Sequence, residues 1–262
     1  MTRGAPMTTD DHTLARELAD LAGARLLSVR EQLHTKGVEG RELKDAGDAA
    51  SQELLAAALA ERAPGDAVLS EEAADDHARL SAERVWIIDP LDGTREFSEV
   101  PRDDWAVHVA LWQSGELVAG AVALPARGVT YSTGEQHRLD LPARPAGDPP
   151  LRLAVSRSRP PAFAEALGRT MGATTVPMGS AGVKAMSVLD GSSDAYVHAG
   201  GQYEWDSAAP VAVAAAHGLH TSRVDGSPLV YNRENPWSPD LVVCRPEVAE
   251  ELLAALATIS LD

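Results

Sequence analysis

Two aspartates, Asp89 and Asp92, are three residues apart in the run VWIIDPLDGT, which covers residues 85–94. The four apolar residues before Asp89 are typical of a strand that is buried between layers, and such a strand ends at the rim of its sheet, where α/β proteins build their sites. Two unpaired carboxylates at this rim would repel each other, and at least one would tend to take up a proton. A hard divalent cation such as Mg²⁺, which prefers carboxylate and carbonyl oxygens, would remove that repulsion.

The neighbouring residues add other parts of a phosphate-handling site. Pro90 restricts the turn, so that both carboxylates and the carbonyl of Leu91 can face one point. Gly93 allows the backbone to approach a phosphate closely, and Thr94 begins a helix whose free N–H groups favour an anion. We therefore favour a functional site over a plain surface turn.

Three further acidic residues lie at predicted element boundaries: Asp48 opens a helix, Glu71 ends a strand and Asp206 opens another helix. Each has an ordinary structural explanation when it is taken singly, because aspartate is a favoured N-cap and an acidic first turn opposes the helix dipole. Taken with DPLDGT, they are candidate ligands of a metal cage.

Two other phosphate chemistries fit the sequence less well. No GxxxxGK[ST] run occurs, so a P-loop is excluded. A phosphatase of the haloacid-dehalogenase type carries its nucleophile in a DxDGT run that opens the domain. Here the run is DxxDGT, it lies in mid-chain, and proline follows the first aspartate. A phosphoaspartate formed at Asp89 is the covalent alternative to the metal cage.

Hydrophobic periodicity predicts the elements that must position these residues. Residues 1–10 are expected to be disordered. Between 105 and 133 we expect two or three strands that are linked by a Ser-Gly turn. The other predicted helices are 11–33, 48–62, 161–172, 181–191, 205–218 and 246–259, and the other predicted strands are 66–72, 84–89, 151–156, 193–200 and 240–244.

Residues 133–150 contain prolines, glycines and charges with little apolar content, which is typical of a domain boundary. We predict an N-terminal α+β domain, 1–145, with most of the metal ligands, and a C-terminal α/β domain, 146–262, with the WD motif and substrate contacts. The predicted fold class is therefore α/β to α+β.

Composition limits the function classes. A formal net charge of −16 argues against generic nucleic-acid binding, which depends on basic side chains. The single cysteine, Cys244, lies in an apolar run and is predicted to be a buried, inert thiol. One cysteine fits a reducing compartment, the N-terminus has no apolar segment of a signal peptide, and no run reaches the length of a membrane span. We expect a cytoplasmic protein that does not bind membranes.

We also expect Trp105 in the core, and His108 and His198 as strand residues rather than metal ligands.

The runs SEE, WIIDPLDGT and EWDSAAPVAVAAAHG, in this order, resemble the inositol monophosphatase superfamily of Mg²⁺-dependent, lithium-sensitive phosphatases. DPLDGT combined with a downstream WDxAA is a specific signature. The resemblance extends from the Asp48 region to the helix after Trp205. It implies a layered αβαβα sandwich of the inositol monophosphatase and fructose-1,6-bisphosphatase type.

Within that superfamily, Arg95-Glu96-Phe97 resembles the branch of CysQ-type 3′(2′),5′-bisphosphate nucleotidases, which act on 3′-phosphoadenosine 5′-phosphate (PAP). The glutamate that contacts inositol in inositol phosphatases would fall near His198 and is missing here. The branch implies removal of the 3′-phosphate of PAP to give AMP in sulfate assimilation or nucleotide recycling, with PAPS as a further candidate substrate. The alternatives are inositol-1-phosphate or fructose-1,6-bisphosphate hydrolysis and, from another class, a non-catalytic metal- or nucleotide-binding protein.

The resemblance also implies site roles. Glu71, Asp89 and the Leu91 carbonyl would hold one Mg²⁺. A second would be held by Asp89, Asp92 and Asp206, and a third, weaker ion would lie near Glu71. Asp48 and Thr94 would orient and deprotonate a water that attacks phosphorus directly, without a phosphoenzyme. The implied substrate contacts are Gly93, Thr94, Ser180, Lys184 and Asp206. Lys184, Arg157 and Arg159 are candidates for the second phosphate, and relatives of this type include homodimers.

Overall fold

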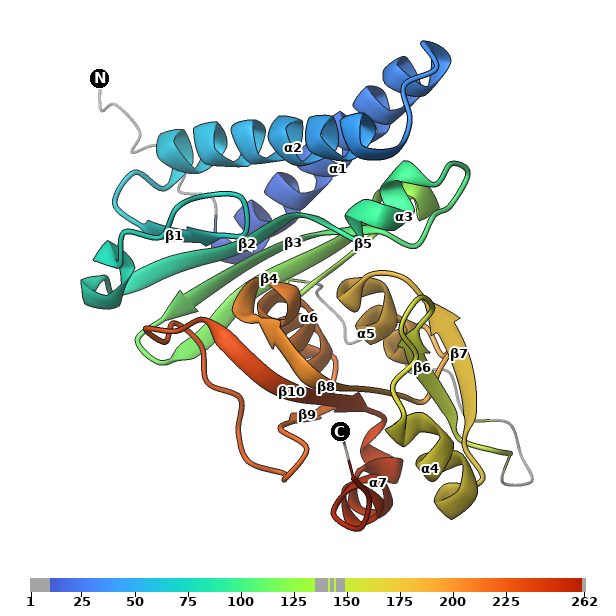
Figure 1. Cartoon of the computed structure of the whole chain (residues 1–262). Helices are drawn as coiled ribbons and strands as arrows, with labels where there is room; N and C mark the ends of the chain where they lie inside the picture. Colours follow the sequence, from blue (N-terminus) through green and yellow to red (C-terminus); the bar gives the residue numbers. More distant parts are fainter. Residues whose placement is uncertain (1–9, 135–140, 142–143, 145–148, 261–262) are drawn as a thin grey trace.

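Two five-stranded sheets form the frame of the computed structural model, which describes residues 10–134, 141, 144 and 149–260 (Figure 1). The first sheet has the strand order β1-β2-β3-β4-β5 and the second has the order β7-β6-β8-β10-β9. In chain order the strands are β1 (Ala67–Ser70), β2 (Arg84–Asp92), β3 (Ala106–Gln113), β4 (Glu116–Leu124), β5 (Val129–Ser132), β6 (Arg152–Ser156), β7 (Thr174–Met178), β8 (Ala195–Tyr203), β9 (His220–Ser222) and β10 (Trp237–Cys244).

Helices cover the outer faces of both sheets and fill the space between them (Figure 1). Helices α1 and α2 lie on the first sheet, α5 and α6 lie between the sheets, and α4 and α7 lie on the far face of the second sheet. The helices are α1 (Asp11–Thr35), α2 (Gly40–Arg62), α3 (Thr94–Ser98), α4 (Phe163–Met171), α5 (Ala181–Leu189), α6 (Glu204–Ala216) and α7 (Ala249–Leu256), with short 3₁₀ turns at Ala78–Ser81, Pro125–Arg127 and Pro246–Val248. The predicted layered αβαβα sandwich is confirmed.

Strand β2 is buried on both of its faces, which explains its unbroken apolar run. Val85 and Ile87 belong to the core cluster between the two sheets, whereas Trp86 and Ile88 belong to the cluster beneath α1 and α2. Successive side chains of a strand point to opposite faces, and each fully buried aliphatic side chain contributes about 1.5–3 kcal/mol. The apolar residues therefore hold the end of β2, with its aspartates, at a fixed place between the layers.

The start of α2 corrects one prediction. The helix begins at Gly40, so Asp48 lies inside it and does not open it. Gly47 is an interior residue of α2, and the helix packs tightly there: an added Cβ would lie 2.6 Å from the ring of Phe97. The functional consequence is that Asp48 projects from a rigid helix in the layer above β2.

Two edge strands were not predicted. Strand β7 contains Pro177, which a sheet tolerates at an edge, and β9 is only three residues long. The predicted disorder at residues 1–10 falls almost wholly outside the described residues. Much of 133–150 does so too, and the domain boundary near 145 stays a prediction. None of the helices in the described ranges combines the length and the apolarity that crossing a bilayer requires.

Candidate metal centre and active site

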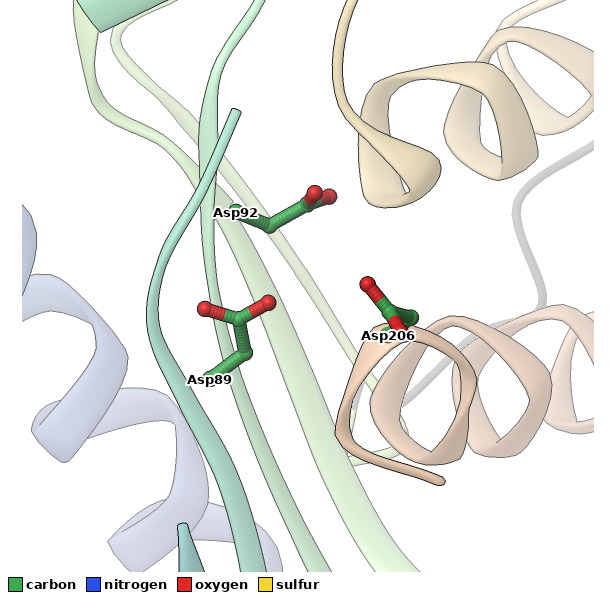
Figure 2. Close-up of side chains that lie close together, drawn as sticks. All are labelled: Asp89, Asp92 and Asp206. Atoms are coloured by element: carbon green, nitrogen blue, oxygen red, sulfur yellow. The ribbon is translucent and has the colours of Figure 1, made fainter. Parts of the chain in front are cut away.

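Three carboxylates converge where β2 ends and α6 begins. Asp89, Asp92 and Asp206 each offer one oxygen, and these oxygens all lie within 4.8 Å of one another. Figure 2 shows the three carboxylates around a common space, with Asp206 projecting from the first turn of α6. The predicted convergence of Asp206 with the DPLDGT aspartates is therefore observed.

A strand irregularity allows the two aspartates of β2 to face the same way. In a regular strand, residues three apart point to opposite faces. Here Asp89 pairs with His108 while Asp92 pairs with Ala106, so β2 has one more residue than β3 between these two pairs, which is a β-bulge. Such a bulge re-aims a side chain, and Pro90 lies inside it.

The carboxylates of the cluster repel one another when they are ionised. Burial raises the pKa of Asp89 well above its usual value, and the charges of Glu71 and Asp92 raise it further. Burial and the charge of Asp92 likewise raise the pKa of Asp206 to about 6. The pKa of Asp92 is about 2, because His108 and Lys184 outweigh the effect of its burial. An oxygen-only donor set whose members resist ionisation beside one another fits a hard divalent cation.

Glu71 and the Leu91 carbonyl lie beside this cluster. Glu71 directly follows β1, and desolvation together with the charges of Asp206 and Asp92 raises its pKa to about 7. The N–H of Leu91 donates to Asp89 Oδ1 at 3.0 Å, and its carbonyl accepts from Thr94 Oγ1 at 3.1 Å. Both residues could therefore add an oxygen to a metal site.

Asp48 and Thr94 meet across the layer boundary. Thr94 Oγ1 lies 3.5 Å from Asp48 Oδ1, and burial, with a contribution from Glu72, raises the pKa of Asp48 to about 7. The single hydroxyl hydrogen of Thr94 serves one acceptor at a time, and the Leu91 carbonyl is the nearer one.

Helix α5 holds Asp92 from the second half of the chain. The Ser180 hydroxyl and the N–H of Gly182 both donate to Asp92 Oδ2, the latter at 2.8 Å. Ser180 also caps α5 by accepting from Val183 N at 3.1 Å. Gly93 is required at this contact, because its φ is 86° and an added Cβ would lie 3.2 Å from the Cβ of Ser180.

A cavity of about 970 Å³ opens above the cluster, and its walls come from β8, β10, α3 and α5. Lys184 is buried in one wall, where its Nζ donates to the Gly179 carbonyl at 3.1 Å and to the Ser180 carbonyl. The lining includes Glu71, Asp92, Gly93, Thr94, Arg159, Ser180, Lys184, His198, Tyr203, Trp205, Asp206 and Trp237.

Three aromatic rings pack together at the cavity. Tyr203 stacks on Trp205 with ring centroids 4.6 Å apart, and it meets Trp237 edge-on at 5.5 Å. Tyr203 and Trp237 are about two-fifths exposed, at 42% and 40%. Ring surface is therefore left open at the edge of the cavity.

The two candidate arginines have different surroundings. Arg157 Nη2 lies 2.8 Å from Glu96 Oε1 and 2.8 Å from Glu99 Oε2, so its charge is already paired. Arg159 lines the cavity, whereas Arg157 is absent from the cavity lining in the part of the chain that the structure describes. The predicted role of Arg157 as a substrate contact stays a prediction.

His108 is the neighbour of the cluster that the sequence did not reveal. Its Nε2 lies 3.2 Å from Asp92 Oδ2, and its ring is fully buried. Burial lowers the pKa of His108, but the charge of Asp92 outweighs burial and the net pKa lies above its usual value. Trp105 is a core residue, as predicted, and packs edge-on against Phe97. Cys244 is buried, as predicted, and burial raises its pKa to about 12.

This fold and this acidic site define a class of protein: the chain belongs to the inositol monophosphatase family, which it matches over residues 8–261. It is 54% identical over 243 residues to the 3′-phosphoadenosine 5′-phosphate phosphatase of Mycobacterium tuberculosis, a match that covers 90% of this chain and 89% of that protein. It is 34% identical to the 3′(2′),5′-bisphosphate nucleotidase CysQ of Escherichia coli, over 74% of this chain and 82% of that protein. The crystal structure of CysQ from Bacteroides thetaiotaomicron superposes with a TM-score of 0.74 at 26% identity, over 90% of this chain and 97% of that one.

Proposed function

We propose that this protein is a Mg²⁺-dependent phosphatase that removes the 3′-phosphate of PAP to give AMP, with PAPS as a second candidate substrate. The observation that carries the proposal is the cavity itself: an acidic cluster that fits a divalent cation lies beside open aromatic rings and a buried ammonium group. The names of the relatives, PAP phosphatase and bisphosphate nucleotidase, support the same substrate.

The aromatic rings favour a nucleotide over inositol-1-phosphate or fructose-1,6-bisphosphate. Base stacking on an aromatic side chain contributes about 1–3 kcal/mol, and a sugar phosphate without a base cannot gain it. Tyr203 and Trp237 are open to the cavity, and Tyr203 is linked to the metal cluster because its N–H donates to Asp206 Oδ2 at 2.6 Å. A base at these rings would therefore have its phosphate within reach of the acidic cluster.

We propose that each site holds two or three Mg²⁺ ions. Their proposed ligands are Glu71, Asp89, the Leu91 carbonyl, Asp92 and Asp206. When bound, Mg²⁺ neutralises phosphate charge and lowers the pKa of water. Among the described residues, three Lys and Arg side chains line the cavity, and Arg95 is paired with Glu99 at 3.1 Å, which leaves Lys184 and Arg159. We propose that these two side chains, with Arg157 as the weaker candidate, hold the phosphate that is not hydrolysed, and that Gly93 and Ser180 contact the substrate.

Asp48 and Thr94 are the proposed proton path. Thr94 Oγ1 orients the attacking water and accepts its proton, while Asp48 Oδ1 takes the hydroxyl hydrogen of Thr94. A pKa of about 7 suits Asp48 to this role near neutral pH. Asp48 Oδ1 and the Leu91 carbonyl are both acceptors near Thr94 Oγ1, and the proposed proton transfer uses Asp48. Direct attack by water requires no phosphoaspartate at Asp89.

The wider setting is proposed on the same basis. The net charge of −16 supports a protein that binds no nucleic acid, and the single buried cysteine supports the cytoplasm as its compartment. A homodimer and a domain division near residue 145 remain part of the proposal.

A phosphate-release assay that compares PAP, PAPS, inositol-1-phosphate and fructose-1,6-bisphosphate tests the proposal. We expect the highest kcat/KM with PAP and no turnover in the presence of EDTA. A preference for inositol-1-phosphate would contradict the substrate, and an Asp92→Asn variant with full activity would contradict the metal site. A phosphoaspartate trapped at Asp89 would contradict direct attack by water.

A further inference from the structure

A buried histidine lies between the two segments that carry the acidic cluster. His108 is on β3, opposite Asp89 in the antiparallel register, and residues paired in this way project from the same face of a sheet. Its side chain has no exposed surface. His108 has no role in the proposed reaction. Burial of a polar side chain costs free energy unless its polar atoms have partners, so the contacts of the two ring nitrogens need an explanation.

The two ring nitrogens contact two segments that are far apart in the chain. Nδ1 lies 3.1 Å from the carbonyl oxygen of Trp205 and carries the hydrogen of that contact, because a carbonyl only accepts. Nε2 lies in direct contact with Asp92 Oδ2, at 3.2 Å, without the alignment of a hydrogen bond. Trp205 directly precedes Asp206. One rigid ring therefore connects the end of β2 with the start of α6.

The packing around the ring is tight. An added Cβ on Gly182 would lie 2.1 Å from Nε2 of His108, so the ring fills the space that this glycine leaves. The Ser180 hydroxyl and the N–H of Gly182 act on the same oxygen of Asp92 that Nε2 approaches. The Ser180 hydroxyl, the Gly182 N–H and His108 Nε2 together hold the Asp92 carboxylate in one orientation. All three contacts are on Oδ2 and none of them is on Oδ1.

We infer that His108 is a positioning residue of the metal centre, which holds the Asp92 carboxylate and the Trp205-Asp206 segment at a fixed separation. The inference rests on the part of the proposed function that gives the acidic cluster a divalent cation, and it is independent of which substrate is hydrolysed. Side chains that orient metal ligands typically contribute a factor of about 10–100 in metal affinity.

Binding of Mn²⁺ to the substrate-free protein tests the inference, because Mn²⁺ shares the preference for carboxylate oxygens and its free form is counted by electron paramagnetic resonance. His108→Leu removes both ring contacts. His108→Asn keeps a polar atom near the Nδ1 position, and His108→Gln keeps one near the Nε2 position. His217→Asn is the matched control, since His217 is also buried and its Nε2 lies 3.1 Å from the Ser132 carbonyl, outside the acidic cluster.

We expect His108→Leu to raise the Kd for Mn²⁺ by a factor of about 10–100, the two amide variants to raise it by less, and His217→Asn to leave it unchanged. A thermal unfolding curve of each metal-free variant verifies that it is folded. A purely structural role would lower the unfolding temperature of the His108 variants and leave their Kd for Mn²⁺ at the wild-type value.

Gly182→Ala keeps the inference falsifiable if the His108 variants do not fold. Alanine favours a helix over glycine, so the substitution suits α5, but its Cβ would push the ring off Asp92. We expect weaker Mn²⁺ binding by this variant too. Wild-type affinity in a folded His108→Leu or Gly182→Ala variant would overturn the inference, as would the absence of Mn²⁺ binding by the wild-type protein. Turnover of PAP is a separate measurement, so the failure of the proposed substrate is distinguishable from the failure of this inference.

Discussion

At this site the pKa of a carboxyl group depends more on its neighbours than on its residue type. Burial alone would raise the pKa of both Asp89 and Asp92, yet only Asp89 follows it, because His108 and Lys184 lie close to Asp92 and lower its pKa to about 2. Two aspartates that are three residues apart therefore have pKa values shifted in opposite directions. The carboxyl group with the lowered pKa is the one that α5 and β3 contact.

Thr94 provides a test at the residue scale. Thr94→Val keeps the side-chain shape and removes the hydroxyl that lies 3.5 Å from Asp48 Oδ1 and that we propose links the attacking water to Asp48. We expect kcat for PAP to fall by a factor of about 10²–10⁴, the usual contribution of proton transfer by a positioned group, while KM changes little. Steady-state kinetics measures this split. Thr94→Ser is the control, since it keeps the hydroxyl, and an equal loss of kcat in both variants would contradict the proposed proton path.

At the scale of elements, the site depends on where β2, α2, α5 and α6 meet. The bulge in β2 turns Asp89 and Asp92 to one side, and α6 brings Asp206 to them from the second half of the chain. Arg157, at the end of β6, adds a further link, because its ion pairs with Glu96 and Glu99 tie the second sheet to α3. The elements of both halves are thus needed to complete one site.

Arg157 and Arg159 form a matched pair for separating this link from substrate binding. Arg157→Gln leaves the buried Glu96 without its partner, so we expect a loss of about 1 kcal/mol in unfolding free energy and a fall of about 2–4 °C in Tm. Arg159→Gln should instead raise KM for PAP with Tm unchanged. Thermal unfolding and steady-state kinetics of both variants check this. An increase in KM confined to Arg157→Gln would reassign the second phosphate to Arg157.

The aromatic rings at the ends of β8 and β10 give a second test at this scale. Tyr203→Ala removes the ring that stacks on Trp205, and we expect KM for PAP to rise by a factor of about 5–50, the equivalent of roughly 1–2.3 kcal/mol of stacking. KM for inositol-1-phosphate should stay constant, since it carries no base. Tyr203→Phe keeps the ring and serves as the control. Equal effects of Tyr203→Ala on both substrates would show that the rings do not bind the base.

The whole molecule is strongly acidic, and its metal site concentrates carboxylates that folding makes harder to ionise. Desolvation raises the pKa of Glu71 and Asp48 to about 7, and that of Asp206 to about 6. Because these groups hold protons more tightly in the folded than in the unfolded chain, the stability they contribute is fully present below about pH 4 and is lost as pH rises toward 7. A divalent cation would reverse the part of this loss that comes from Glu71 and Asp206, since these two are proposed ligands and would bind it in their ionised form.

We therefore expect the metal-free protein to lose stability between about pH 5 and pH 7.5, and Mg²⁺ to raise its Tm more at the higher pH. Thermal unfolding in EDTA and in Mg²⁺ across this range measures both effects. Asp206→Asn lacks one of the three ionising groups and should show a smaller dependence on pH in EDTA. A Tm that Mg²⁺ raises equally at both ends of the range would contradict the assignment of Glu71 and Asp206 to the cation.

Local sequence patterns predicted an α/β to α+β fold and the carboxylates, the family resemblance implied the layered sandwich, and long-range packing decided the rest. The apolar run before Asp89 and the WD motif before Asp206 can be read within a few residues, so both ends of the site were accessible from the sequence. The start of α2 could not be predicted from the sequence, because Gly47 suits the helix interior only through its close packing against Phe97. His108 looked like an ordinary strand residue, since its contacts with Asp92 and Trp205 exist only once β3, α5 and α6 are packed.

Release of inorganic phosphate from PAP, with the nucleotide product identified by chromatography, tests the central claim most directly. With Mg²⁺ present we predict that phosphate and adenosine 5′-phosphate accumulate in equal amounts, and that EDTA stops the reaction until Mg²⁺ is restored. Unchanged turnover in EDTA, or adenosine 3′-phosphate as the product, would contradict the account.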